Sequence, residues 1–554
     1  MKNAIQLILT LLILNSPAQG FPAEEWLSND IDPIWAEPNA PKGGVFRGYI
    51  PEFPPTFRIW GPYAHHPLRS LFSDNQLSLV SFHPNTGKPI PSLASEWFFH
   101  KNNKAISFRI HEDAKWSDST PVTSQDFTFT KSFFISGKAK DPWFKSFYHE
   151  NIESIKAIDS KTLYIEANQP MDKQTLIKVL NLRPLPKHFY SQPEDNLIKT
   201  SQWRVEPNTG PYILSGYSFG DELIFRRKTE WWGKSLKYNL GRYNVDTVVY
   251  KVYQTRSDVR KAFAEGFIDY YRSTASHTHS PQFASLIERG AAHHFIFNHK
   301  ENTNFNGILI NPQGPILSDI NVRRALSLGL SFEKPDTAYQ PITHLLKNNA
   351  IESNTHNPFD AKRILTQAGW LRDAKTDIRQ KDSQALVLEL VFDNRISQTV
   401  VAHLIENANE IGIKINAFPL TPTQLQTYLV NKVFDLALLA FDQQHFDQTT
   451  FFNNEDFEKP GNWAFFKSTP NKYNETYDIA KQYLAIPAYS SAYSYGYHWR
   501  WIVFPKVPST RSAKHLYQPF AGGGQFWIDR AFLIETRTNR RKSFRFEKAI
   551  QVFD

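Results

Sequence analysis

Hydrophobic and polar residues alternate with a period of two in several short stretches of the chain, and this pattern predicts half-buried β-strands. Elsewhere apolar residues recur every three or four positions, which predicts amphipathic helices. Because the two patterns are interleaved along the whole chain, we expect a mixed α/β fold. The alternating stretches are residues 106–110, 161–166 and 248–253.

Capping residues predict where several helices begin and end. Ser257 is a suitable N-cap for a helix that Gly266 can terminate, and Asp319 is a suitable N-cap for a second helix. Thr421 and Gln424 form a capping box with proline at the first helical position. Each of these signals predicts one helix boundary.

Residues 385–441 follow the order strand, helix, strand, helix, strand. The helix between the first two strands carries an apolar stripe that includes Val401, Leu404 and Ala408. The last strand, residues 434–441, is apolar at nearly every position, as expected for a strand buried on both faces. This order predicts a lobe built on a parallel sheet.

The first twenty residues have the pattern of a cleavable signal peptide. Lys2 is followed by an apolar run to Leu14, and Ala18-Gln19-Gly20 is a small-x-small cleavage site. The apolar run has about 11 residues, whereas a membrane span needs about 20. We therefore expect cleavage and export, and an uncleaved anchor helix is the alternative.

Composition excludes several classes of protein. The 554 residues are enough for two to four domains. With 41% hydrophobic and 21% charged residues, the chain is neither disordered nor a polytopic membrane protein. Cysteine is absent, which excludes disulfides, thiolate metal sites and a lipid-modified cysteine. Aromatic residues make up 14% of the chain, which suits aromatic-lined binding surfaces.

The net charge of +9 is small for this length, and its densest basic stretch lies near the C-terminus, at residues 537–548. We interpret that stretch as a solvated terminal surface, because an exported chain rarely meets nucleic acid. No nucleic-acid partner is expected.

Motifs for catalysis and metal binding are weak. Residues 216–220 match the G-x-S-x-G nucleophile elbow with Ser218 as nucleophile, but short strand patterns on both sides indicate a β-hairpin instead. His65-His66, His293-His294 and His277-Thr278-His279 lack carboxylates at ligand spacing, so we expect no metal site and no cofactor. The residues alone therefore predict an exported α/β protein that is not an enzyme.

Several motifs, in order along nearly the whole chain, resemble the family 5 extracellular solute-binding proteins of ABC importers. The longest runs from Phe108 to Phe129 and is similar to the family's F-x-L-R-x-x-A-x-W-x-D-G-x-P-V-T-A-x-D-V-x-F, with Ser119 in place of its glycine. The other motifs are Pro41-Lys42-Gly43-Gly44, Pro91-Ser92-Leu93-Ala94, Thr209-Gly210-Pro211-Tyr212, Trp231-Trp232, Gly241–Asp246, Ala264–Asp269, Asp319–Leu326, Ala368-Gly369-Trp370, Phe434-Asp435-Leu436, Asn462-Trp463 and Ile486-Pro487. Four of these motifs look most like the branch that includes peptide and microcin C uptake proteins: Pro41-Lys42-Gly43-Gly44, Gly241–Asp246, Asn462-Trp463 and Ile486-Pro487.

The resemblance implies a two-lobe periplasmic-binding-protein fold of type II, with an extra accessory domain and a ligand cleft between the lobes. Two hinge connections would cross near residues 300 and 500. Residues 331–357 and 474–486 are shorter than is usual in the family, which bears on ligand specificity. The implied divisions are a signal peptide at 1–20, lobe one at 21–75, 200–300 and 500–554, its accessory domain at 76–199, and lobe two at 301–499.

The resemblance also implies ligand-binding residues. Asp442, directly after the Phe-Asp-Leu strand, matches the aspartate that holds the amino terminus of a peptide in family members. A turn or cap aspartate is the alternative. Asp447 is a second choice, Asn462 and Trp463 could offer a hydrogen bond and an aromatic wall, and Tyr63 and Trp116 are further wall candidates.

The function implied is that of a monomeric periplasmic protein that binds peptides or peptide-like solutes and delivers them to the membrane subunits of an ABC importer. It would bind without turnover and would not be a lipoprotein. Two alternatives stay open at this point. One is a secreted serine hydrolase that uses Ser218, and the other is a family member that binds haem or a metal chelate.

The mature protein is expected to begin at Phe21, because the cleavage site ends at Gly20. N-terminal sequencing of the protein from the periplasmic fraction would test this. A sequence that begins at Met1 would contradict both the signal peptide and the periplasmic location.

Overall fold

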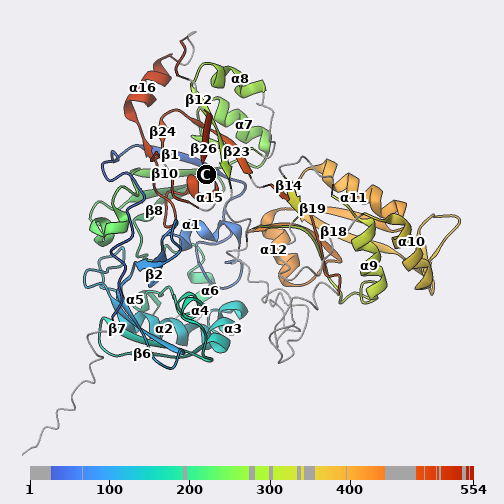
Figure 1. Cartoon of the computed structure of the whole chain (residues 1–554), viewed down its shortest axis with the longest axis horizontal. Coiled ribbons are helices and arrows are strands. Elements are labelled where there is room, and N and C mark those ends of the chain that lie inside the picture. Colours follow the sequence, from blue (N-terminus) through green and yellow to red (C-terminus); the bar gives the residue numbers. More distant parts are fainter. Residues whose placement is uncertain are drawn as a thin grey trace, which may run out of the picture.

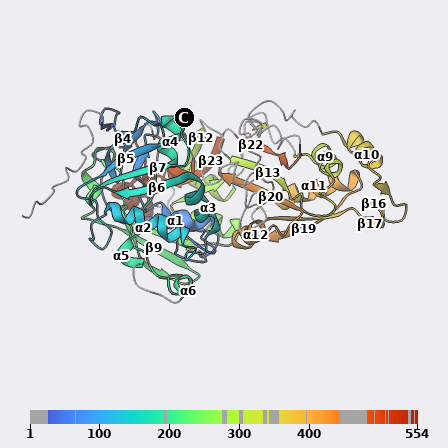
Figure 2. The ribbon, with the colours of Figure 1, turned by 90° about the horizontal axis from the view of Figure 1, so that it is seen from below.

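The structure is a computed structural model, and it divides into two bodies (Figure 1). The larger body comprises the described residues of 26–298 and 493–553, and the smaller body comprises the described residues of 304–491. Figure 2 shows the two bodies side by side along the long axis of the molecule. The structure describes residues 26–64, 66–190, 196–273, 281–298, 304–332, 339–341, 356–394, 396–442, 482–491, 493–506, 508–510, 513–539, 544–547 and 550–553.

The first sheet of the larger body has the strand order β1-β10-β9-β8. β1 is parallel to β10, and the other pairs are antiparallel. Alternate residues of β1, including Phe46 and Ile50, point into the core, as the period-two pattern requires. The strands are β1 (Val45–Ile50), β10 (Thr247–Val252), β9 (Glu222–Arg227) and β8 (Tyr212–Ser218).

The second sheet of the larger body has the order β11-β23-β12-β26 and joins distant parts of the chain. β23 pairs with both β11 and β12. The sequence assigned residues up to 499 to the second lobe, so this pairing moves the second crossing to a point just before Tyr493. The strands are β11 (Tyr270–Ser273), β23 (Tyr493–Trp499), β12 (Ala292–Asn298) and β26 (Ile550–Phe553), with the helices α7 (Arg256–Ala264) and α8 (Pro281–Glu288) against them.

Helix α7 begins two residues earlier than the sequence suggested. Its N-cap is Thr255, whose hydroxyl oxygen accepts a hydrogen bond from the backbone N–H of Asp258. Ser257, the predicted cap, lies inside the first turn. Both residue types cap helices well, and here the Thr255 hydroxyl also donates to the Asp258 carboxylate over 2.7 Å, which closes the turn. The predicted end is correct, since Gly266 follows the helix with φ +72°.

A third sheet of the larger body, with order β4-β5-β7-β6, is entirely antiparallel. The predicted strands at 106–110 and 161–166 are β5 and β7. Ser119 lies in the tight turn before α2 with φ +75°, a conformation that favours glycine, as in the family pattern. The elements are β4 (Ala94–Phe99), β5 (Ala105–Ile110), β6 (Ile152–Ala157), β7 (Thr162–Ala167), α2 (Ser124–Ile135), α3 (Pro142–Asn151) and α4 (Lys173–Val179).

The smaller body is built on a five-stranded sheet of order β19-β18-β20-β13-β21. β18 is parallel to β19 and β20, as predicted, but β13 and β21 are antiparallel to their neighbours, so the sheet is mixed rather than parallel. The two antiparallel strands lie outside residues 385–441, on which the prediction rested. The strands are β19 (Lys414–Leu420), β18 (Val387–Asp393), β20 (Leu436–Asp442), β13 (Asn304–Ile310) and β21 (Ala485–Pro487).

Helices cover both faces of this sheet. Two separate apolar clusters show this arrangement: one includes Leu388, Leu404 and Leu436, and the other includes Val391 and Leu425. Asp319 caps α9, and Thr421 with Gln424 forms the predicted capping box of α12. The helices are α9 (Ile320–Gly329), α10 (Pro358–Gln367) and α11 (Gln398–Glu410) on one face and α12 (Pro422–Val430) on the other.

Short elements complete the described fold. They are β2 (Val80–Phe82), β3 (Pro89–Pro91), β14 (Tyr339–Pro341), β15 (Leu371–Arg372), β16 (Arg379–Lys381), β17 (Gln384–Ala385), β22 (Tyr489–Ser491), β24 (Ile502–Val503), β25 (Trp527–Ile528), η2 (Pro67–Arg69), α1 (Ser70–Ser73), α5 (Lys187–Tyr190), α6 (Leu197–Thr200), η3 (Trp232–Ser235), η4 (Lys237–Asn239), α15 (Ala513–Leu516) and α16 (Arg530–Asn539).

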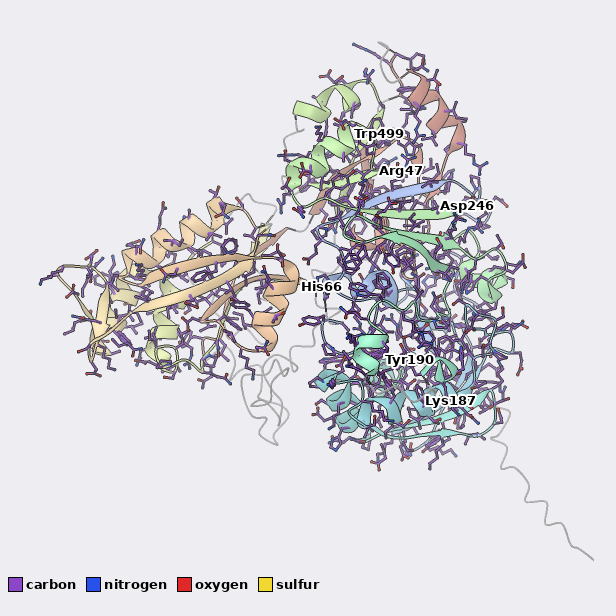
Figure 3. The ribbon with its side chains drawn as sticks, turned by 180° about the vertical axis from the view of Figure 1, so that it is seen from behind. Arg47, His66, Lys187, Tyr190, Asp246 and Trp499 are labelled. Atoms are coloured by element: carbon purple, nitrogen blue, oxygen red, sulfur yellow. The ribbon has the colours of Figure 1, made fainter. Side chains whose placement is uncertain are left out.

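A buried aspartate joins the first and second sheets. The carboxylate of Asp269 accepts hydrogen bonds from the backbone N–H of Arg47 (2.6 Å) and from the Trp501 indole N–H (3.1 Å). The Arg47 guanidinium lies 3.8 Å from the same carboxylate. The backbone of Asp269 also bonds to Arg47 and to Trp499, so β1 and β23 are fixed to one residue. Figure 3 shows Arg47 and Trp499 near each other in the larger body.

The charge of Asp269 makes the stability of the protein depend on pH. Burial raises its pKa to about 6, although Arg47 and the two hydrogen bonds act in the opposite direction. The folded state therefore holds the proton more tightly than the unfolded state, and stability falls as the pH rises from about 4 to 6. This contribution should reach about 3 kcal/mol, since one pKa unit corresponds to about 1.4 kcal/mol.

Asp269→Asn removes this titration, so the difference in unfolding free energy between wild type and variant should change across that pH range. Urea unfolding at a series of pH values measures it. Asp246→Asn, which changes an exposed aspartate paired with Arg227, is the matched control and should follow the wild-type curve. Parallel curves for wild type and Asp269→Asn would contradict the assignment.

Candidate ligand-binding site

The carboxyl ends of three parallel strands meet at one edge of the smaller body. β18 ends at Asp393, β19 at Leu420 and β20 at Asp442. β19 and β20 flank β18 on opposite sides, so the chain reverses its winding direction there. In open α/β sheets such a switch point forms a crevice at the carboxyl ends of the strands, and ligands bind in it.

The chain enters the smaller body at this same edge. β12 of the larger body ends at Asn298 and β13 begins at Asn304, which pairs with Asp442. Six residues span at most about 20 Å, so the end of β20 lies near the larger body. The edge with Asp442 therefore faces the junction between the two bodies.

Asp442 is the predicted contact for a ligand ammonium group, and the structure describes its backbone as the last residue of β20. Its role as a ligand contact stays a prediction. Asp447, Asn462 and Trp463 lie outside the described residues, as do most of residues 331–357 and 474–486.

Tyr63 and Trp116, the two wall candidates of the larger body, have different environments. Tyr63 is 56% exposed and has φ +65°. Trp116 is 2% exposed and belongs to the main hydrophobic core, with its ring 6.1 Å from that of His188. In this conformation Tyr63 is accessible to a solute, whereas Trp116 acts as a core residue.

A polar pair that the sequence did not indicate lies just beyond the carboxyl end of β1. The Nε2 of His66 is 2.8 Å from the Glu52 carboxylate, and the Nδ1 of His66 accepts a hydrogen bond from the backbone N–H of Leu68. A neutral imidazole therefore carries its proton on Nε2 and donates it to Glu52. Figure 3 shows His66 on the side of the larger body that faces the smaller one. The sequence analysis did not predict the strand at 45–50. Such a prediction would have placed Glu52 just beyond the carboxyl end of that strand.

The serine of the G-x-S-x-G match lies in a hairpin. Ser218 is the last residue of β8, pairs with Glu222 of β9 and is exposed. A nucleophile elbow requires a strand followed by a helix, and here an antiparallel strand follows. The expected hairpin is confirmed, and the elbow geometry is absent at this position.

The paired histidines of β12 take part in packing. His293 lies 5.4 Å from the ring of His498, and both contact Gln551. Burial lowers the pKa of His293 to about 3 and that of His498 to about 4, so both are neutral at pH 7. His294 points to the other face and packs on Tyr497. Among the described residues no three His, Asp or Glu side chains form a group that could hold a metal ion, and His65, His277 and His279 lie outside them.

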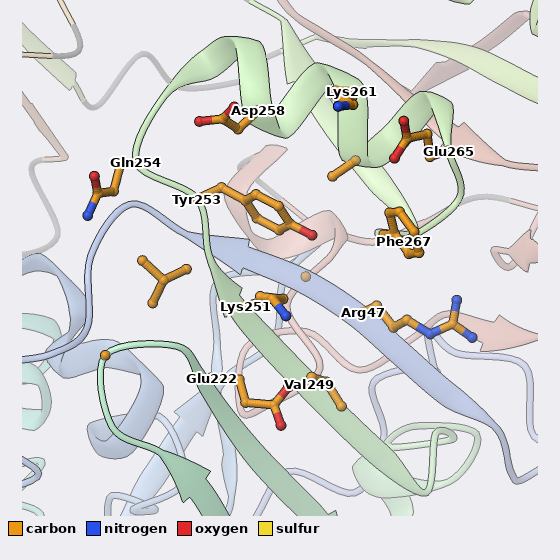
Figure 4. A pocket seen from close by; sticks show the side chains of 14 residues that line it. Arg47, Glu222, Val249, Lys251, Tyr253, Gln254, Asp258, Lys261, Glu265 and Phe267 are labelled. Atoms are coloured by element: carbon orange, nitrogen blue, oxygen red, sulfur yellow. The ribbon is translucent and has the colours of Figure 1, made fainter.

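A hollow of about 670 Å³ lies beside α7 in the larger body (Figure 4). Its lining includes Phe267, which is 61% exposed, and Tyr253. All of its lining belongs to the larger body, and its charges are of both signs, so it does not select a ligand charge and does not bring the two bodies together. The charged lining residues are Arg47, Glu222, Lys251, Asp258, Lys261 and Glu265.

Comparison with known proteins identifies this architecture. Residues 88–463, more than half of the chain, match the bacterial extracellular solute-binding proteins, family 5 Middle. The chain belongs to this family. The resemblance seen in the sequence is thereby confirmed at the level of the family, while the branch with microcin C uptake proteins stays a prediction.

Solved structures support the two-lobe fold. The oligopeptide-binding protein AppA of Bacillus subtilis, solved with a nonapeptide, has a TM-score of 0.70 at 16% identity over 89% of this chain and 100% of its own. NikA of Brucella suis, solved with Fe(III)-EDTA, has a TM-score of 0.63 at 16% identity over 88% and 100%. The chain therefore has the two-lobe fold of periplasmic binding proteins.

Relatives found by sequence comparison align with a smaller share of the chain than the solved structures do. The peptidoglycan-binding protein YepA of Agrobacterium fabrum is 27% identical over 239 residues, which are 41% of this chain and 38% of YepA. The first two relatives, from Sinorhizobium fredii and Brucella melitensis, are likewise matched over only 37% and 39% of their length. In the part of the chain that the structure describes, no helix is both long and apolar enough to cross a membrane.

Proposed function

We propose that the protein is a periplasmic solute-binding protein that captures peptides or peptide-like solutes and delivers them to an ABC importer. The observation that carries this proposal is the edge of the smaller body, where three parallel strands end beside the crossing from the larger body. Membership in family 5 and the likeness to AppA, whose structure holds a nonapeptide, support peptides as the solute. The protein binds its solute without transforming it.

The two bodies act as a clamp. The chain crosses between them after Asn298 and again between Ser491 and Tyr493, so two short connections serve as hinges. A solute that touches both bodies stabilises the closed form through contacts that the open form lacks. The closed form then presents the importer with a surface that differs from that of the empty protein.

A metal chelate is the second candidate solute, because NikA, a structural neighbour, was solved with Fe(III)-EDTA. The described histidines give little support to a metal chelate, because His66, His293 and His498 already take part in hydrogen bonds or packing. Mass spectrometry of the co-purified solute, with a visible spectrum and metal analysis, would distinguish the two. A peptide supports the proposal, whereas a chelate or haem overturns the peptide assignment.

Asp442→Asn should lower the affinity for a peptide with a free amino terminus by at least about tenfold. The variant keeps the shape of the side chain and removes its charge, and a charge-assisted hydrogen bond contributes roughly 1.5–3 kcal/mol. Calorimetric titration with trialanine and N-acetyl-trialanine measures the effect. Wild type should prefer the free amine, and the variant should hardly distinguish the two.

The matched control is Asp382→Asn, because Asp382 is exposed in the turn between β16 and β17, away from the carboxyl end of β18. Asp382 has φ +51°, which asparagine also tolerates. The affinity of Asp382→Asn for trialanine should equal that of wild type. If Asp442→Asn binds trialanine as tightly as wild type, Asp442 is not the ammonium contact and Asp447 becomes the next residue to change.

Saturation with the solute should make the protein more compact, because closure brings the two bodies together. Small-angle X-ray scattering with and without the co-purified solute measures the radius of gyration. Asp442→Asn at the lowest concentration that nearly saturates wild type should be less occupied and should show a larger mean radius of gyration. An unchanged radius of gyration in saturated wild type would contradict the clamp.

A further inference from the structure

Arg272 occupies a position in the larger body that corresponds to that of Asp442 in the smaller one. It is the third residue of β11, and it is exposed. Ser273 pairs with Tyr495 of β23, and Tyr495 pairs with Ile296 of β12. Both crossings leave this sheet two residues farther on, at the paired Asn298 and Tyr493.

This register places Arg272 close to the junction between the bodies. Two residues of a β-strand span about 7 Å, so the end of β11 lies within about 7 Å, along the strand direction, of the point where both connections leave. Figure 1 shows β23, the partner of β11, at the side of the larger body nearest the smaller one. Arg272 and Asp442 therefore lie on opposite walls of the same junction.

The surroundings of Arg272 contain neutral aromatic groups. Its backbone N–H donates to the Tyr49 hydroxyl over 3.3 Å. Tyr270 lies on the same face of β11 and stacks on Tyr517, with ring centroids 4.6 Å apart and planes at 7°. Burial raises the pKa of Tyr49 and of Tyr517, so these phenols carry no negative charge at neutral pH that could offset the guanidinium.

Arg272 also lacks an anionic partner among the residues that the structure describes. No carboxylate of those residues lies within 4.0 Å of its guanidinium, in contrast to Arg47, Arg227 and Arg500, which all have one. Tyr517 is 3% exposed, and its buried hydroxyl likewise has no hydrogen-bond partner in the described part of the chain. Within the described part of the larger body, Arg272 is thus a positive charge without a carboxylate partner, beside a polar group whose bonding capacity is unused.

We propose that Arg272 binds a carboxylate of the solute, so that the protein selects a solute with an anionic group at the larger body and an ammonium group at Asp442. A planar guanidinium suits this role, because it can donate two parallel hydrogen bonds to one carboxylate. The carboxylate is either the carboxyl terminus of a peptide or an acidic side chain. This inference rests on the proposed binding function and narrows its substrate class to dipolar peptides.

The first test compares trialanine with trialanine amide by calorimetric titration. Wild type should bind the acid at least about tenfold more tightly than the amide, and Arg272→Gln should bind both about equally. The amide of Ala-Glu-Ala distinguishes the two sources, because binding as tight as that of the acid would assign Arg272 to a side-chain carboxylate. If wild type binds all three peptides equally, the inference is overturned while the proposed function stands.

Arg226→Gln is the matched control, because Arg226 is also an exposed arginine on a strand of the larger body, in β9. Arg226→Gln should keep the wild-type preference for the acid over the amide. Arg272→Lys should keep part of that preference, because lysine retains the positive charge. Thermal unfolding checks that Arg272→Gln is folded. Should that variant not fold, Arg272→Lys decides the question, because it retains the charge but loses the paired hydrogen bonds and should weaken the preference for the acid.

The second test uses the solute that co-purifies with the protein, identified by mass spectrometry. A solute with an acidic group whose yield falls at least about tenfold in Arg272→Gln, but not in Arg226→Gln, supports the inference. If that solute is acidic but is not a peptide, the carboxylate contact of Arg272 stands, whereas the narrowing to dipolar peptides and the proposed peptide function fall. A solute without any acidic group overturns the inference.

Discussion

The larger body depends on a single buried carboxylate. Asp269 accepts hydrogen bonds from Arg47, which is 222 residues away in the chain, and from Trp501, which is 232 residues away. Burial of a carboxylate is costly, and the donors with the nearby guanidinium offset that cost. Because the same residue also bonds through its backbone to β1 and β23, the two sheets are held in one relative position.

That position determines where the two bodies meet. With β11 and β23 fixed beside β1, both crossings leave the larger body at one end of its second sheet. They enter the smaller body where the parallel strands end. The reversal of winding at β18 places the switch point, where open α/β sheets bind ligands, at that edge rather than at the opposite one. The place of the candidate binding site is thus a consequence of strand order and register, before any ligand contact is considered.

The fold leaves the chemistry of the solute open, because function is determined by the side chains placed on it. AppA and NikA share this fold, yet one was solved with a nonapeptide and the other with Fe(III)-EDTA. In this chain the residues that we propose to distinguish the solute lie at the facing edges, Asp442 in the smaller body and Arg272 in the larger one. The hollow beside α7 carries charges of both signs and belongs to the larger body alone.

The sequence by itself determined the local elements and the family. The alternation in β5 and β7, the Asp319 cap and the Thr421–Gln424 capping box depend on residues within a few positions, so each could be predicted. Only the tertiary structure decided that β13 runs antiparallel beside β20, that β23 belongs to the larger body and that Arg272 lies at the junction. The physical reason is that pairing and register join segments far apart in the chain, whereas periodicity and capping record only the immediate neighbours of a residue.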